Sequence, residues 1–161
     1  MNWEAYRRRR DDRPVHVATR ILRAEKVREL PVNVERLLAW LEVRVERRTA
    51  PGWECALNSI VLPPTVWVNE DMPGTRQRFA MAHALGQLLL NPADGLVVAD
   101  AHFSPGQDRD ERDVNEFAAS LLVPLWMLEP LVADRRLSTE EIATVFQVSV
   151  GVVGMQLEKL L

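Results

Sequence analysis

The residues with the clearest potential for chemistry lie in the segment 78–90, RFAMAHALGQLLL. In a helix, side chains four positions apart share a face, so two histidines at that spacing can hold one zinc ion. A glutamate directly after the first histidine can then take a proton from zinc-bound water. Here His83 is the first histidine, but Ala84 takes the place of the glutamate and Gln87 that of the second histidine. The segment therefore has the spacing of a zinc-binding helix, but two of the three side chains that such a helix uses, the glutamate and the second histidine, are replaced.

The bulk properties predict one domain that is soluble and cytoplasmic. The chain has 161 residues, 47% of them hydrophobic and 27% charged, which is typical of a globular domain with its own core. The net charge of -3 gives no general reason to bind nucleic acid. Cys55 is the only cysteine, which excludes an internal disulfide and a cysteine-based zinc site. No apolar stretch reaches the roughly 18 residues of a membrane span.

The hydrophobic patterns around this segment predict an α+β fold in which helices dominate. Helical spacing is found at 17–30, where Pro31 would end the helix, and at 32–43, 78–90, 113–124 and 138–161. Alternating patterns at 43–48, 53–64 and 65–70 predict a small antiparallel sheet, with Cys55 in the core. The segment 91–113 is predicted to be a long loop with one strand at 96–98.

The first 14 residues are predicted to be a basic, flexible arm in solvent, because a dense run of like charge cannot bury itself. Its aromatic and basic side chains are the candidates for contact with a partner, and Trp3 is the aromatic residue that we expect to be exposed. These candidates are Trp3, Tyr6, Arg7, Arg8, Arg9 and Arg10.

Three segments in order, RQRFAMAHALGQLLLN, ERDVNEFAASLLVP and EIATVFQVSVGVVGMQLEKL, resemble the ImmA/IrrE family of metallopeptidase-like proteins. The matching positions include Arg78 with Phe79, Glu111, Asn115 and the run 117–124. The resemblance extends from Leu30 to the last residue. It implies a zincin-like helical domain with a small antiparallel sheet at 15–135, followed by a packed C-terminal helical subdomain at 136–161.

The resemblance also implies a role for each position of the site. His83 matches the first zinc ligand, and Glu111 looks like the third, on a helix that packs across from the first. Gln87 takes the position of the second ligand, where an amide oxygen binds zinc far more weakly than imidazole, and Ala84 cannot move a proton. Because loss of a general base alone lowers the rate about a hundred- to ten-thousand-fold, we expect no catalytic residue. Because one metal ligand is also replaced, we expect no bound metal. The set would be a vestigial site, with the His83 ring partly buried and hydrogen-bonded to Glu111 or Gln87.

Two alternatives use other residues. His102, or Asp94 and Asp100, could complete a zinc site with His83 and Glu111, which would make the chain a divergent zinc-dependent peptidase that cleaves a repressor. His16 is too far along the chain to be expected there.

The C-terminal segment has the spacing of apolar and capping residues that is typical of a helix-turn-helix. If it bound DNA, the chain would be a DNA-binding transcriptional regulator. Its second helix offers only Gln156 and Lys159 to DNA, beside Glu158, so we expect a structural or protein-contacting role instead.

The expected function is that of an inactive ImmA/IrrE-like protein that acts by protein–protein interaction. The resemblance implies a phage, mobile-element or stress-response setting, in which the partner would be a helix-turn-helix repressor or a similar regulator. A protein that binds such a repressor can change its affinity for DNA without cutting it. No contact with a membrane is expected.

Overall fold

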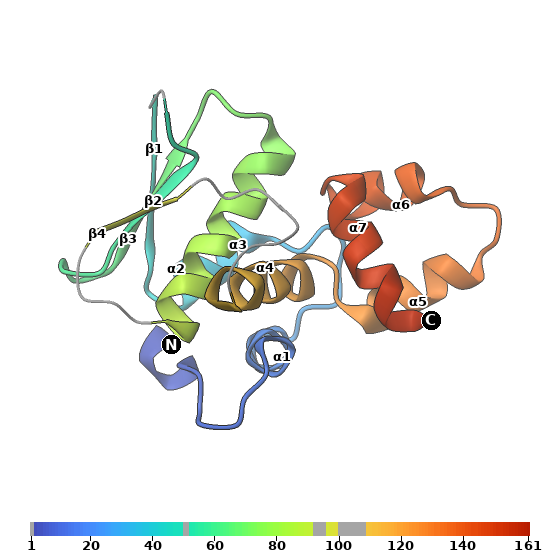
Figure 1. Cartoon of the computed structure of the whole chain (residues 1–161), viewed down its shortest axis with the longest axis horizontal. Helices are drawn as coiled ribbons and strands as arrows, with labels where there is room; N and C mark the ends of the chain where they lie inside the picture. Colours follow the sequence, from blue (N-terminus) through green and yellow to red (C-terminus); the bar gives the residue numbers. More distant parts are fainter. Residues whose placement is uncertain (1, 50–51, 92–95, 100–108) are drawn as a thin grey trace.

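A computed structural model describes residues 2–49, 52–91, 96–99 and 109–161 of the chain. The α+β prediction is confirmed: Figure 1 shows the sheet at one end of the molecule, α5, α6 and α7 at the other, and α1, α3 and α4 between them. In chain order the elements are η1 (Trp3–Tyr6), α1 (Pro14–Ala24), α2 (Val34–Trp40), β1 (Arg44–Arg48), β2 (Cys55–Asn58), β3 (Thr65–Asn69), α3 (Gly74–Leu90), β4 (Leu96–Ala99), α4 (Arg109–Leu122), α5 (Leu125–Ala133), α6 (Thr139–Phe146), α7 (Val150–Leu157) and η2 (Glu158–Leu160).

The sheet has four described strands in the order β1-β3-β2-β4 and is mixed. The strand β2 runs antiparallel to both β3 and β4, whereas β1 and β3 are parallel, with Arg44 opposite Thr65. The prediction of a purely antiparallel sheet is therefore wrong for the pair β1·β3. The reason is the strand order: β3 inserts between β1 and β2, and since consecutive strands reverse direction, β1 and β3 run the same way. The strand predicted at 96–98 is confirmed as β4.

The central helix α3 packs on β2 and β3 with one side and on α4 with the other, and α4 in turn packs on α1 and α7. From Phe79 to Leu90 every residue of α3 is buried except Gln87, which is half-buried. The sequence predicts a broad apolar face for this helix, and in the structure the buried surface extends around almost its full circumference. A helix in this position has little freedom to move, so the side chains that it carries are held in place.

The first helix ends earlier than predicted. Residues 17–30 were expected to be helical up to Pro31, but α1 begins at Pro14 and ends at Ala24. Lys26 adopts a left-handed conformation with φ 55°, and the Val27 amide donates to the Leu22 carbonyl at 2.9 Å. This geometry caps the helix and turns the chain before Pro31 is reached.

The N-terminal segment differs from the solvated arm that was predicted, because backbone and side-chain contacts tie it to the body. The Trp3 amide donates to the Leu41 carbonyl at 3.0 Å and the Arg8 amide to the Leu89 carbonyl at 2.9 Å. The Arg8 guanidinium also pairs with Asp113 of α4 at 2.7 Å.

The two aromatic side chains of this segment are half-buried rather than exposed. The Tyr6 ring lies 5.5 Å from that of Trp40, and Trp3 packs against the core. Arg8 is half-buried, so Arg7, Arg9 and Arg10 are the arginines of the predicted partner set that are exposed.

Among the described residues, no single helix combines the length and the apolar character needed to cross a membrane; α4 and α5 satisfy both criteria only together, as a pair bent by 62°.

Candidate functional site

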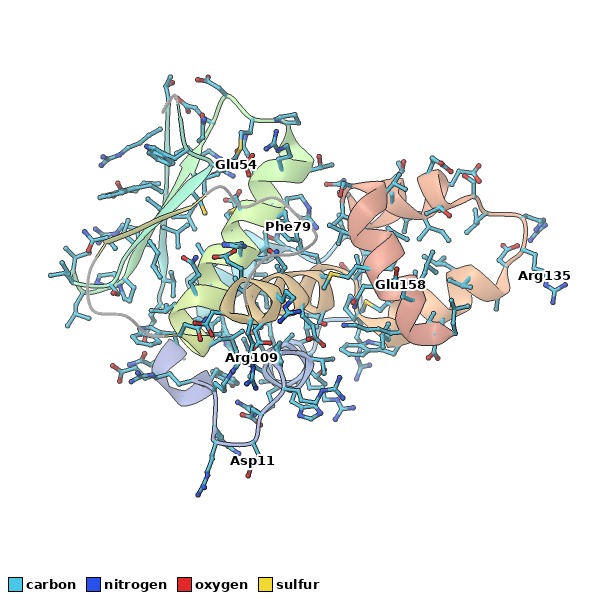
Figure 2. All side chains as sticks on the ribbon, in the orientation of Figure 1. Asp11, Glu54, Phe79, Arg109, Arg135 and Glu158 are labelled. Carbon is cyan, nitrogen blue, oxygen red and sulfur yellow. The ribbon has the colours of Figure 1, made fainter. Side chains whose placement is uncertain are left out.

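The polar cluster at the centre of the molecule is built around His83, whose side chain has no exposed surface. It projects from the middle of α3, one turn after Phe79, whose position Figure 2 marks; the two ring centres are 6.3 Å apart. The prediction of a partly buried histidine therefore underestimates its burial. A fully buried imidazole needs a hydrogen-bond partner for each ring nitrogen, because water cannot supply one.

The two ring nitrogens of His83 have different partners. The Nδ1 atom lies 3.1 Å from Oδ1 of Asn115 on α4, and Nε2 lies 3.3 Å from the amide nitrogen of Gln87. An amide nitrogen only donates and a carbonyl oxygen only accepts, so one tautomer satisfies both contacts. With the proton on Nδ1, the ring would donate to Asn115 and accept from Gln87; the roles of the two nitrogens depend on the tautomer.

Glu111 is the third member of the cluster. It lies in the first turn of α4, where a carboxylate is favoured by the helix dipole, and its Oε2 atom is 3.7 Å from Nε2 of His83. Its side chain is one-third exposed. The structure thus brings together His83, Gln87 and Glu111, as the family resemblance implies, and adds Asn115.

Close contact between α3 and α4 sets these distances. Gly86 lies on α3 against α4, and a Cβ atom there would be 2.9 Å from Cδ1 of Phe117 and 3.2 Å from Cγ1 of Val114. Only glycine permits the two helices to approach this closely. The side chains of His83 and Asn115 can then meet across the interface.

The described residues do not fit a catalytic zinc ion. Zinc in proteins takes its ligands from imidazole, thiolate and carboxylate groups, and a catalytic site uses three of them. No group of three His, Cys, Asp or Glu side chains suited to a metal is found in the described part of the chain. Gln87, at the position of the second ligand, offers an amide in place of an imidazole, and this amide lies 3.3 Å from Nε2 of His83.

The position of a general base is also apolar. Ala84 has no exposed surface and belongs to the hydrophobic core. Of the alternative ligands, His16 is exposed on α1, where its Nδ1 atom accepts from the Arg13 amide at 3.4 Å. His102, Asp94 and Asp100 lie outside the described residues. Cys55 is buried at 1% exposure, which confirms its predicted place in the core.

The C-terminal helices have the predicted helix-turn-helix arrangement. Ser138 and Glu141 form the predicted capping box at the start of α6, and Ser149 caps α7. Gln156, expected to face outward if α7 read DNA, is fully buried and donates to the Val123 carbonyl at 2.8 Å. Lys159 pairs with Glu116 of α4 at 3.3 Å. Both side chains therefore attach the helix pair to α4.

Sequence reasoning did not assign a role to Arg78. Its guanidinium donates to the carbonyls of Phe146 and Gln147, at 3.2 and 3.1 Å, where α6 ends. A cation is favoured at this end of a helix because the free carbonyls carry partial negative charge. Burial lowers the pKa of Arg78 from its ordinary value. Arg78 thus joins α3, which carries the polar cluster, to the C-terminal helices.

Asn115 is the residue of the cluster whose role was missed. The signal was present, since an asparagine inside the otherwise apolar stripe of α4 must have a buried partner.

Comparison with known proteins shows which family the chain matches. The family model described as Peptidase_M78, the IrrE N-terminal-like domain, matches residues 40–158. This range contains α3, α4 and the C-terminal helices. A search of curated proteins found no match.

Proposed function

The chain belongs to the family of IrrE N-terminal-like domains, and we propose that within it the chain is a catalytically inactive protein that regulates a partner by binding it. One observation carries the proposal: the Nε2 atom of His83, which would hold the metal in an active relative, lies in hydrogen-bond contact with the Gln87 amide instead. With Ala84 in place of the base, neither the metal nor the proton transfer of a zinc peptidase has its residues.

The inferred partner is a cytoplasmic helix-turn-helix repressor or a similar regulator, in a phage, mobile-element or stress-response setting. The binding surface would be the former substrate groove, where an extended segment of the partner can add to the sheet beside β4, an edge strand of the described sheet. If the chain binds one conformational state of the repressor more tightly than another, it changes the repressor's affinity for DNA. By linkage, DNA changes the affinity of the chain for the repressor by the same coupling free energy.

Direct binding of DNA by this chain is not part of the proposal. Gln156 of α7 and Lys159 of η2, the two side chains that this segment would offer to bases or phosphates, are both engaged with the body of the protein. The outward residues Ser149, Val150 and Gly151 at the start of α7 carry no charge. These observations support a structural or protein-contacting role for the helix pair.

The experiment first asks whether a neighbouring reading frame encodes a helix-turn-helix regulator, and then mixes the purified chain with that regulator. Two properties of the regulator are measured: its length by mass spectrometry and its affinity for its operator by gel shift. We expect a regulator of unchanged mass with a changed operator affinity. Cleavage of the regulator that requires His83, detected as its loss in a His83→Ala variant, would contradict the proposed inactivity. Unchanged mass together with unchanged operator affinity would contradict the proposed regulation.

A further inference from the structure

A second surface lies at the edge of the sheet opposite β4. A groove with a volume of about 790 Å³ opens beside the start of β1, between η1, the end of α2 and the turn before β3. Its lining includes Val43–Val45 of the β1 region, Leu62–Pro64 of the turn and Asn2–Glu4 of the N-terminal segment. None of its lining residues belongs to α3 or α4, so this groove is separate from the polar cluster around His83.

The strand beside this groove has one unused side. In the described sheet β1 pairs only with β3. The Arg44 amide donates to the Pro64 carbonyl, and the Arg48 carbonyl accepts from the Glu70 amide. Because alternate residues of a strand direct their backbone groups to opposite sides, the N–H and C=O groups of Val45 and Arg47 point away from β3. These are the groups that an added strand would use.

The turn before β3 adds an exposed apolar wall. Three consecutive aliphatic side chains, Ile60, Val61 and Leu62, are 72%, 43% and 84% exposed, and Leu62 itself lines the groove. A contiguous run of exposed aliphatic residues beside a groove is typical of a protein-binding surface. It can receive an aliphatic side chain of a bound segment.

The charge of the lining indicates what the segment must carry. Three carboxylates, those of Glu4, Glu35 and Glu42, line the groove with a single guanidinium, that of Arg44. Glu35 already pairs with Arg47 of β1. Within the described part of the chain, the exposed Glu4 and Glu42 form no ion pair.

The aromatic wall of the groove already accepts a cation. The guanidinium carbon of Arg7 lies 5.8 Å from the centre of the Trp3 ring, within the range of a cation–π contact. Arg7 takes this ring face, so the carboxylates of Glu4 and Glu42 are the groups of the groove that suit positively charged side chains.

We propose that this groove binds an extended segment of a partner protein in which basic and aliphatic residues alternate. The segment adds to the open edge of β1 as a further strand. Because side chains alternate along a strand, one set packs on Leu62 and Pro63 while the other reaches Glu4 and Glu42. The proposal holds whether or not the chain has lost peptidase activity, since it uses no residue of the α3–α4 cluster.

The test uses three synthetic peptides: one in which valine and lysine alternate, one with glutamate in place of lysine, and the lysine peptide with methylated backbone nitrogens. Binding is measured by calorimetry, and the amide signals of Val45 and Arg47 are followed by NMR. We expect saturable binding of the unmethylated lysine peptide alone, with shifts at both amides. Equal binding of the methylated peptide would overturn the added strand, and equal binding of the glutamate peptide or no binding of any peptide would overturn the proposal.

A matched pair of variants locates the binding. The double variant Leu62→Ser with Glu42→Lys changes two exposed side chains of the groove, and we expect it to bind the lysine peptide about tenfold more weakly or less. The control Leu161→Ser with Glu129→Lys changes the exposed leucine that follows η2 and an exposed glutamate of α5 in the same way. An equal loss of affinity in the control, or full affinity in the groove variant, would overturn the assignment to this groove.

Discussion

The hydrogen bond between His83 and Asn115 is the contact that best explains how a buried histidine persists here. The contact of Nδ1 with Asn115 orients the imidazole so that Nε2 faces Gln87 and Glu111. In metal sites a partner of this kind orients the ligating ring. The orienting contact is thus present in this chain, whereas Gln87 stands where the second metal ligand of such a helix would be.

Removal of Asn115 and removal of Gln87 should have unequal effects on stability. Asn115 is 1% exposed and Asn115→Ala removes its buried hydrogen bond with Nδ1 of His83, so we expect a loss of about 1–3 kcal/mol in the free energy of unfolding. Gln87 is half-buried and water can replace its amide, so Gln87→Ala should cost less than about 1 kcal/mol. Denaturant unfolding of both variants measures the difference. A Gln87→Ala loss as large as that of Asn115→Ala would contradict this description of the cluster.

At this scale, the sequence predicts the contact of His83 with Gln87, because residues four apart in a helix share a face. The short distance of Glu111 from His83 was implied only by the family resemblance. The Asn115 contact was not predicted, because it depends on the rotation of α4 against α3, which local periodicity does not determine.

At the scale of elements, Gly86 sets the distance between α3 and α4. The Gly86→Ala variant places a methyl group 2.9 Å from Phe117, which is fully buried and cannot move aside, so we expect a loss of about 1–3 kcal/mol. Gly154 in α7 is the matched control, since a Cβ there meets no atom within 4 Å. Gly154→Ala should stabilise the protein by about 0.5–1 kcal/mol through helix propensity. Thermal unfolding of the two variants in parallel checks the signs; the same sign for both would refute the close approach.

Arg78 holds the C-terminal helix pair against α3. Arg78→Ala removes both bonds to the end of α6, and we expect a loss of about 1–3 kcal/mol together with faster hydrogen exchange in α6 than in α3. Arg78→Lys should retain part of this protection because it retains the charge. Arg135, exposed at the turn between α5 and α6 in Figure 2, is the control position. If Arg135→Ala accelerated exchange in α6 as much, the role of Arg78 would be wrong.

Helices and strands were easier to predict than their order in space. The capping box at Ser138 and the strand at β4 follow from local sequence. The end of α1 could not be predicted from local sequence, because the residue in the left-handed conformation there is Lys26 and not the glycine or asparagine that usually marks the end of a helix. The parallel pairing of β1 with β3 results from the insertion of β3 beside β1, which alternating hydrophobicity cannot indicate.

On the scale of the whole molecule, the N-terminal segment is fastened to the helical body by charged contacts. Asp12 accepts from the Arg9 amide at 2.9 Å and from the Arg20 guanidinium of α1 at 2.6 Å. Burial alone would raise the pKa of Asp12, but these hydrogen bonds and the charge of Arg20 outweigh it, so the pKa is lowered. The composition of the segment predicted a solvated arm because it does not reveal that partners for the arginines lie far away in sequence.

The lowered pKa of Asp12 predicts a pH dependence of stability. A carboxyl group with a lower pKa in the folded state stabilises the protein above its ordinary value of 3.8, and the contribution is lost as the pH falls through the lowered value. The Asp12→Asn variant should therefore be less stable than the native chain at neutral pH, and the difference should shrink in acid.

Denaturant unfolding at several pH values measures this difference. Asp11→Asn, at a side chain that points away from the body in Figure 2, is the control and should match the native chain throughout. A gap between the Asp12→Asn variant and the native chain that stays constant down to strongly acidic pH would contradict the prediction.

The zinc content of the native chain, purified without chelator and measured per protein molecule, tests the central claim most directly. The Gln87→His variant is the positive control, because it places a second imidazole beside His83 and Glu111 and should take up zinc. We predict no stoichiometric zinc in the native chain and about one zinc ion per molecule in the variant. One zinc ion per native molecule, lost in both His83→Ala and Glu111→Ala variants, would contradict the account.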